Sequence, residues 1–169
     1  MNLFVPYSSK KSFFIEKIKK GNKFIKIISF KNIPVIGGAN KLNSSFFKYS
    51  LANPLFQNVL IAGLFTSLKM QFKTIILWGA DHSWHENFKL SDENFIYTPD
   101  KHFFDNSSEV KYFMHTHPDG SPKKVHEEFF TVARAFSVYH SIAHFSETIN
   151  CKVINLSSKS WIDAFNRKL

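Results

Sequence analysis

Apolar and polar positions follow one another along the chain in blocks that predict strands and helices in turn. The apolar residues from Ile75 to Trp78 predict a strand buried on both faces, within a segment at 74–79. Shorter apolar segments at 23–30 and 151–156 predict two more strands. Residues 33–40, with one proline and two glycines, predict a loop or a short edge strand. Residues 12–20 predict a short amphipathic helix that ends at Gly21.

Three further helices are expected after residue 50. Asn53 followed by Pro54 is typical of a helix start, and apolar residues up to Met70 predict that this helix is buried against the sheet. Ser121–Pro122 predicts the start of a long helix that continues to about residue 148, and Ser157–Ser158 the start of a final helix. Residues 89–111 are polar with scattered aromatic side chains, which favours a lid or a compact excursion.

Strands that alternate with helices are typical of α/β domains. We expect a Rossmann-like three-layer domain at 23–169, with a mainly parallel sheet of about four strands and helices on both faces. An irregular lead-in segment at 1–22 precedes it. So few strands predict an incomplete doubly wound fold. This expectation includes parallel pairing between the strands at 24–30 and 74–79.

The formal charge of +9 changes this picture, because the excess is concentrated near the start of the chain. It lies in one lysine cluster at positions 10, 11, 17, 19, 20, 23, 26 and 31. Such a cluster suits a phosphorylated substrate or peripheral contact with an anionic membrane, and a solvated lysine-rich face is the plain alternative. No motif of a known nucleic-acid-binding module accompanies it, so no nucleic-acid partner is expected.

Compartment and membrane topology are constrained by two further observations. No stretch reaches about 18 consecutive apolar residues, so no membrane span is predicted. The single Cys151 excludes a disulfide framework and is interpreted as a packed thiol in a reducing compartment. We therefore expect a cytoplasmic protein, peripheral at the inner membrane if the lysine cluster binds lipid.

Titratable side chains are concentrated directly after the strand at 74–79. Gly79–Ala80 ends that strand, and the next six residues are Asp81, His82, Ser83, Trp84, His85 and Glu86. Ligands bind at the carboxyl ends of strands in open α/β sheets, and such a density of titratable groups is typical of functional sites. A polar loop after a core strand is the alternative.

His126 is the candidate general base. It lies near the start of the predicted long helix, and helix starts and strand carboxyl ends share one rim of an α/β domain. Asp81 and His126 are therefore expected in one cleft, within about 10 Å of each other. A neutral histidine there suits deprotonation of a sugar hydroxyl, whereas a helix-start histidine in solvent is the alternative.

Two other groups of residues have alternative interpretations. Gln57 and Asn58 are polar residues within the predicted helix from 53, either paired near its cap or facing a ligand. His115-Thr-His117-Pro118 resembles the motif of the JAMM zinc metalloproteases, but Val125 stands where that family has serine. Glu128 stands where it has its third ligand, an aspartate. We interpret 117–120 as a surface turn and predict no metal site.

Several segments together resemble one protein family. They are residues 53–62, 75–87 (with Gly79-Ala-Asp-His-Ser-Trp84 the most specific part), 125–127, 151–155 and 161–165. The family is the bacterial surface-polysaccharide group of 6-hydroxymethylpterin diphosphokinase MptE-like proteins. More distantly, the chain is similar to the lipooligosaccharide sialyltransferases of glycosyltransferase family 42. The resemblance covers roughly residues 50–169, the carboxyl-terminal part of such a transferase.

The resemblance implies a Rossmann-like fold, a nucleotide-sugar donor (CMP-linked in the sialyltransferases), a glycan acceptor and no essential metal or other cofactor. It implies His126 as the base, with Asp81, His82 and Ser83 near the donor phosphate. Trp84, Asn58 and Glu127 complete the expected substrate-binding residues. Ser83 stands where the family has a phosphate-binding tyrosine, and the glycine-rich turn of the family's first half has no counterpart.

Three functions follow from these features. The first is a glycosyltransferase-like protein of cell-surface polysaccharide or lipooligosaccharide synthesis. The second is a pterin diphosphokinase-like enzyme, which would need ATP and Mg²⁺ although the chain has no phosphate-binding loop motif. The third is a truncated, non-catalytic remnant, which the missing glycine-rich half favours. Binding of a nucleotide separates the first two from the third.

Overall fold

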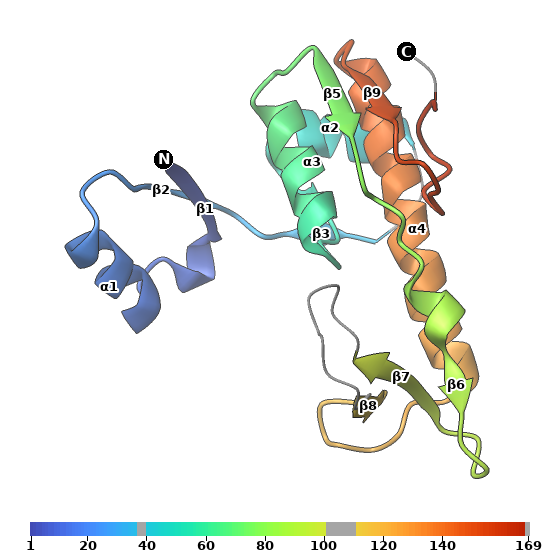
Figure 1. The fold of residues 1–169 in the computed structure, drawn as a ribbon. Coiled ribbons are helices and arrows are strands. Elements are labelled where there is room, and N and C mark those ends of the chain that lie inside the picture. The colour runs from blue at the N-terminus through green and yellow to red at the C-terminus, as the bar shows by residue number, and fades with distance from the viewer. Residues whose placement is uncertain (37–39, 101–110, 168–169) are drawn as a thin grey trace.

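The described residues form a mixed α/β structure of four α-helices and several small, mostly parallel sheets (Figure 1). The computed structural model describes residues 1–36, 40–100 and 111–167. The α-helices are α1 Phe13–Gly21, α2 Lys41–Lys48, α3 Val59–Lys69 and α4 Val125–Thr148. The strands are β1 Asn2–Pro6, β2 Lys26–Phe30, β3 Pro34–Val35, β4 Asn53–Pro54, β5 Thr74–Leu77, β6 Lys89–Leu90, β7 Ile96–Asp100, β8 Lys111–Met114 and β9 Lys152–Asn155.

Strand pairing differs from the expected single sheet. Among the described residues, β1 pairs with β2, β3 with β4 and β5 with β9, all parallel. The predicted pairing between 24–30 and 74–79 is wrong, because β2 takes its partner from the beginning of the chain. There Leu3, Phe4 and Val5 form a strand instead of an irregular lead-in, in register with Ile27, Ile28 and Ser29. The division of the chain at residue 22 stays a prediction.

Helix α3 begins later than the sequence predicts. Asn53 and Pro54 form β4, and the Asn53 side chain accepts a hydrogen bond from the Ile33 N–H at 2.7 Å. The cap is Asn58, whose side-chain oxygen accepts from the Ile61 N–H at 2.9 Å. Asparagine therefore caps the helix as expected, but five residues further along the chain.

Two expectations near the predicted ligand-binding edge are also wrong. The strand β5 is not buried on both faces: Ile76 is 43% exposed and Trp78, just beyond it, 72% exposed, whereas Leu77 is buried. No final helix forms at 157–165, because this segment instead packs irregularly along β9, with Ile162 and Phe165 in the core. The ends of α1 at Gly21 and of α4 at Thr148 are confirmed.

The described residues at 89–100 and 111–114 contain more regular structure than the expected excursion. Strands β6, β7 and β8 form an antiparallel sheet, which lies beside the first turns of α4 (Figure 1). Residues 101–110 of the predicted lid lie outside the described part of the chain. The predicted turn at 117–120 is confirmed, with the Gly120 N–H bonded to the His117 carbonyl at 2.9 Å.

The main core lies where α2, α3 and α4 meet β5, β9 and the segment after β9. Its most completely buried large side chains include Phe47, Ile61, Leu68, Tyr139, Ile142, Phe145 and Ile162. Residues from every one of these elements are buried together, so the loops after β5 and β9 start from a fixed base. No helix in the described ranges is both long and apolar enough to cross a bilayer.

Candidate functional site

The loops that follow β5 and β9 are bound to each other. The Ala80 N–H donates to Ser157 Oγ at 2.8 Å, and the Ala80 carbonyl accepts from the Ser160 hydroxyl. The Trp161 N–H donates to the Asp81 carbonyl at 2.8 Å. Asn155, fully buried at the end of β9, donates to Ser160 Oγ. The two loops therefore form one surface at the carboxyl ends of two parallel strands, where ligands bind in open α/β sheets.

A cavity of about 760 Å³ opens between these loops, and we call it the Trp161 cavity. Its lining includes Trp78, Asp81, Ser83, Glu86, Lys159 and Trp161. Glu86 Oε1 accepts from Lys159 Nζ at 3.0 Å and from Trp161 Nε1 at 2.7 Å. These hydrogen bonds lower the pKa of Glu86, so this carboxylate is already neutralised by partners from the other loop.

Asp81 is held by its own loop. Its carboxylate oxygens accept from the His82 N–H at 2.9 Å and from the Ser83 hydroxyl at 3.1 Å. Partial burial is the largest single influence and raises the pKa of Asp81, but these hydrogen bonds together outweigh it, so its pKa lies below the ordinary value. Asp81 is therefore an ionised acceptor at the edge of the Trp161 cavity.

His82 connects this loop to two helices. It is half-buried with φ of +55°, and its Nε2 faces the Tyr139 hydroxyl of α4. The Tyr139 hydroxyl donates to Asn58 Oδ1 at 3.3 Å, so the tyrosine oxygen accepts from His82 Nε2–H. Burial lowers the pKa of His82, against the raising effect of Asp81, and burial raises the pKa of Tyr139 to about 12. His82 therefore fixes the loop, and it does not line the Trp161 cavity.

A second cavity at the same edge, of about 620 Å³, has unpaired polar atoms; we call it the amide cavity. It lies between the start of α3, the loop after β5, the β6–β7–β8 sheet and α4, and its lining includes Gln57, Asn58, Trp84, Phe88, His115 and Glu128. Gln57 Oε1 and Asn58 Nδ2 are buried without a hydrogen-bond partner, one an acceptor and the other a donor. Trp84 stacks on Phe136, with 5.9 Å between ring centroids.

An acid–histidine pair also lines the amide cavity. Glu128, only 7% exposed, accepts from Lys123 Nζ at 2.9 Å, and its other oxygen lies 3.1 Å from His115 Nδ1. Burial raises the pKa of Glu128, but the interactions with Lys123 and His115 together lower it by more, so its pKa lies below the ordinary value. Glu128 is therefore ionised, and its hydrogen bond with His115 is assigned with His115 Nδ1–H as the donor. In the neutral tautomer that donates from Nδ1, His115 Nε2 is the acceptor nitrogen, and it lies 3.1 Å from Thr98 Oγ1. Such an arrangement can accept a proton from a bound hydroxyl group.

This pair is the main feature that sequence reasoning does not identify. In the sequence, His115 and Glu128 are compared only with a zinc motif. In the structure, the two histidines of that motif face two different carboxylates. His115 faces Glu128, whereas His117 Nε2 lies 3.2 Å from Glu127 Oε2. Within the described ranges, no group of three or more His, Cys, Asp or Glu residues could hold a metal ion.

His126 and Asp81 do not share a cavity. His126 is exposed on the first turn of α4 and lines neither the amide cavity nor the Trp161 cavity. His82, the neighbour of Asp81, contacts α4 at Tyr139, which lies 13 residues after His126. An α-helix rises about 1.5 Å per residue, so His126 and Tyr139 are about 20 Å apart along α4. The expected single cleft is not found because α4 extends past the sheet edge. The catalytic role of each residue stays a prediction.

The other predicted substrate-binding residues divide between the two cavities and a helix start. Asn58 and Trp84 line the amide cavity, and Ser83 lines the Trp161 cavity. Glu127 accepts from the Lys124 N–H at 2.7 Å, which is the main cause of its lowered pKa. Glu127 therefore caps the first turn of α4 and lies beside His117, and it lines neither cavity.

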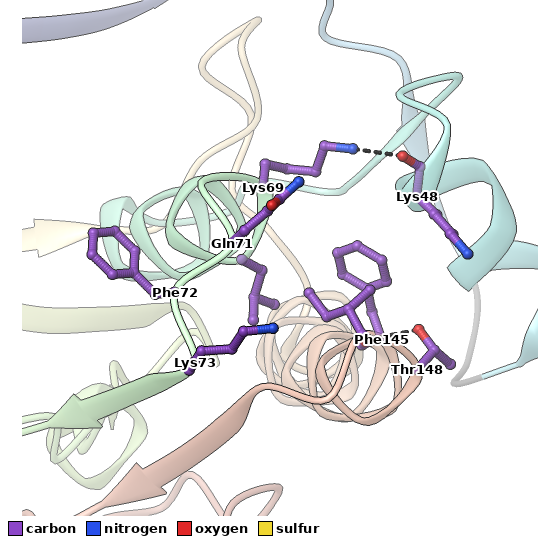
Figure 2. A pocket seen from close by; sticks show the side chains of 9 residues that line it. Lys48, Lys69, Gln71, Phe72, Lys73, Phe145 and Thr148 are labelled. Atoms are coloured by element: carbon purple, nitrogen blue, oxygen red, sulfur yellow. Dashed lines mark hydrogen bonds between the residues drawn. The ribbon is translucent and has the colours of Figure 1, made fainter.

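A smaller cavity of about 310 Å³ lies at the opposite edge, and we call it the lysine cavity (Figure 2). Lys48 and Lys69 line it at the carboxyl ends of α2 and α3, Thr148 lines it at the end of α4, and Lys73 lines it just before β5. Lys69 Nζ donates to the Phe47 and Lys48 carbonyls at 2.7 and 2.8 Å, and burial lowers its pKa. Its charge therefore compensates the negative end of α2 and satisfies carbonyls that the helix leaves unpaired.

Comparisons with protein-family models, with curated proteins and with solved structures found no match for this chain.

Proposed function

We propose that this chain is a glycosyltransferase-like protein that binds a nucleotide-activated sugar in the amide cavity and acts in cell-surface polysaccharide or lipooligosaccharide synthesis. The observation that carries the proposal is the unpaired amide pair of Gln57 and Asn58 beside the Glu128–His115 pair. A volume of about 620 Å³ is of the size that accommodates a small organic ligand. The resemblance of residues 50–169 to surface-polysaccharide proteins supports the same function.

The unpaired atoms favour a ligand with adjacent donor and acceptor groups. A free amide oxygen can accept from the exocyclic amine of a nucleobase, and a free amide N–H can donate to a neighbouring ring acceptor. Cytosine presents this pattern, which agrees with a CMP-linked donor. Trp84 supplies an aromatic face in the same cavity. The first N–H groups of α3 are proposed to stabilise the negative charge of the leaving phosphate.

In the proposed reaction, an acceptor glycan hydroxyl attacks the anomeric carbon of the donor sugar. The new carbon–oxygen bond forms as the bond to the nucleotide phosphate breaks, and the phosphate keeps the electron pair. His115 Nε2 takes the hydroxyl proton, and Glu128 stabilises the resulting imidazolium through Nδ1–H. The predicted general base His126 is a competing assignment. Asp81 and Ser83 belong to the neighbouring Trp161 cavity, where they are proposed to contact the acceptor.

We also propose that residues 53–157 represent part of a Rossmann-like fold. The parallel pairing of β5 with β9, and helices α3 and α4 in the same core, support this assignment. The expected glycine-rich half has no counterpart in the sequence, so the amide cavity would carry donor binding alone.

Ligand-dependent thermal stabilisation tests donor binding directly. The protein is heated with CMP-, UDP- and GDP-sugars, with ATP, and with 6-hydroxymethylpterin plus ATP and Mg²⁺. We expect stabilisation by a nucleotide sugar, which Asn58→Asp abolishes because it removes the Nδ2 donor but keeps the capping oxygen. Stabilisation only with pterin and ATP would favour the diphosphokinase, and none with any nucleotide would favour the non-catalytic remnant.

Turnover of the stabilising donor separates the two candidate bases. His115→Gln is expected to lower kcat by about 100-fold or more while donor binding persists. His126→Gln is the matched control: the His126 side chain is exposed on the first turn of α4, and this variant is expected to leave kcat unchanged. The reverse result would return the base to His126 and overturn the assignment of His115.

A further inference from the structure

Helix α1 exposes its aromatic residues instead of burying them. Phe13 is 83% exposed and Phe14 69% exposed, whereas Ile15 is 5% exposed and holds the opposite face. Successive helix residues are about 100° apart, so Phe13, Phe14 and Lys17 share one face. Burying a phenylalanine side chain is favourable, so this face is left without a stabilisation that a partner can supply.

A further exposed phenylalanine lies in the turn between α1 and β2. Phe24 is 86% exposed, although its backbone is well fixed: its N–H donates to Asn22 Oδ1 at 3.0 Å. The following strand is bonded to β1 through Lys26 N–H and the Met1 carbonyl at 2.8 Å. The β1–α1–β2 unit lies to one side of α2, α3 and α4 in the ribbon view (Figure 1) and contacts the edge of the main core through Phe30, whose ring centroid lies 5.8 Å from that of Phe56. An ordered backbone therefore presents these apolar side chains outward.

Most of the positive charge of the chain surrounds these aromatic residues. Residues 1–31 contain eight lysines, no arginine and one acidic residue, a net +7 against +9 for the whole chain. The one acid, Glu16, is paired with Lys19 at 2.9 Å. Lys20 lies on the α1 face that carries Phe13. The surface thus combines exposed apolar rings with nearly uncompensated cations.

We propose that the β1–α1–β2 unit binds the surface of an anionic lipid bilayer, with Phe13 and Phe14 inserted at the headgroup level and the lysines against the lipid phosphates. Lysines beside exposed aromatic rings suit a lipid surface, because the lysines attract anionic headgroups while the aromatic rings enter the boundary between headgroups and acyl chains. The cations are all lysine, which binds phosphate as a point charge and lacks the planar bidentate geometry that arginine uses for nucleic acids. This proposal is independent of the sugar-nucleotide site.

Sedimentation with vesicles tests the charge and the aromatic residues separately. Binding is expected to vesicles that contain about 30% phosphatidylglycerol, not to phosphatidylcholine alone, and to weaken at high salt. Lys17→Gln with Lys20→Gln is expected to weaken binding at least tenfold. Phe13→Ser with Phe14→Ser is expected to weaken it similarly, with less change in its salt dependence. Equal binding to neutral and anionic vesicles would overturn the proposal, and so would vesicle binding that neither double variant weakens.

Insertion is measured with an environment-sensitive fluorophore. Cys151 is buried, so in a Cys151→Ser background Phe13→Cys is labelled with a nitrobenzoxadiazole probe, whose emission shifts to the blue in apolar surroundings. The same label on Ser137→Cys of α4 is the control and is expected not to shift. Tighter binding to a fluorescent oligonucleotide than to anionic vesicles, or a concentration-dependent dimer that hides the label, would assign this surface to nucleic acid or to a second copy instead.

Discussion

Helix α3 has a cavity at each end, and the two cavities differ in whether their polar atoms are already paired. At the end of α3, in the lysine cavity, Lys69 donates to two carbonyls of α2. At its start, Gln57 Oε1 and Asn58 Nδ2 in the amide cavity have no partner. Leaving a buried polar atom unpaired costs about 1–3 kcal/mol, so a protein that retains two of them together indicates a site for a ligand.

The lysine cavity would be the more obvious candidate from charge alone. Three lysines around one cavity suggest an anion site, yet they lie where three helices end and where carbonyls accumulate. Cations at helix ends are favourable without any ligand. Charge therefore distinguishes the two cavities less well than unpaired hydrogen-bonding atoms do, and the following changes test this difference in order of expected effect.

Glu128→Gln is expected to have the largest effect. It removes the charge that pairs Lys123 and His115, and should lower the free energy of unfolding by about 2 kcal/mol at neutral pH. The pKa of Glu128 lies below its ordinary value of 4.5 in the folded protein, so this contribution is present above that value and is lost as pH falls through the lowered pKa. Urea denaturation of both proteins across acid pH measures it. A difference that is constant with pH would contradict the ionised pair.

Asn58→Ala should have the next largest effect. It removes the α3 cap and the acceptor of the Tyr139 hydroxyl, and is expected to cost about 1–2 kcal/mol. Asn58→Asp is the matched variant, which keeps both acceptors and should leave the unfolding midpoint nearly unchanged. If Asn58→Asp destabilises as much as Asn58→Ala, the unpaired Nδ2 has a structural role, and the amide cavity loses its distinction.

Lys69→Met tests the opposite end of the helix. It retains the apolar stem but removes both hydrogen bonds to α2, and is expected to cost about 1 kcal/mol in thermal or chemical unfolding. Binding of any nucleotide sugar should be unchanged. Reduced affinity in this variant would show that the lysine cavity takes part in ligand binding.

Gln57→Leu should have the smallest effect on stability and a clear effect on binding. The unpaired Oε1 is replaced by apolar atoms, so the unfolding free energy should change by no more than about 0.5 kcal/mol in either direction. Affinity for the donor, measured by calorimetry, should fall about fivefold to tenfold. A stable variant with unchanged affinity would remove Gln57 from the site.

Elements with local signals are the ones the sequence predicts well. Ser12 and Gly21 bound α1 because a cap and a helix-ending glycine act on their own neighbours. Two asparagines precede α3, and only tertiary contacts decide between them, since Asn53 pairs with the backbone at Ile33. The β1–β2 pairing is likewise a choice among several apolar segments that no local pattern specifies.

The candidate site follows the same division. The density of polar residues after β5 correctly marks a cavity edge, because that signal is contained in consecutive residues. The His115–Glu128 pair joins a loop to a helix across a turn, and its spacing matches neither a helix nor a strand period. Both residues lie in the segment that resembles the zinc motif. A direct pairing of His115 with a nearby carboxylate, instead of with a metal, would therefore identify them.

The positions of the three tryptophans make the protein its own spectroscopic sensor. Trp84 lines the amide cavity, whereas Trp78 and Trp161 line the Trp161 cavity, and all three are partly open to solvent. A small collisional quencher such as acrylamide can therefore reach each indole in the free protein. A compound seated in the amide cavity shields Trp84 alone, so the fraction of emission that becomes protected reports which of the two cavities is occupied, without any label.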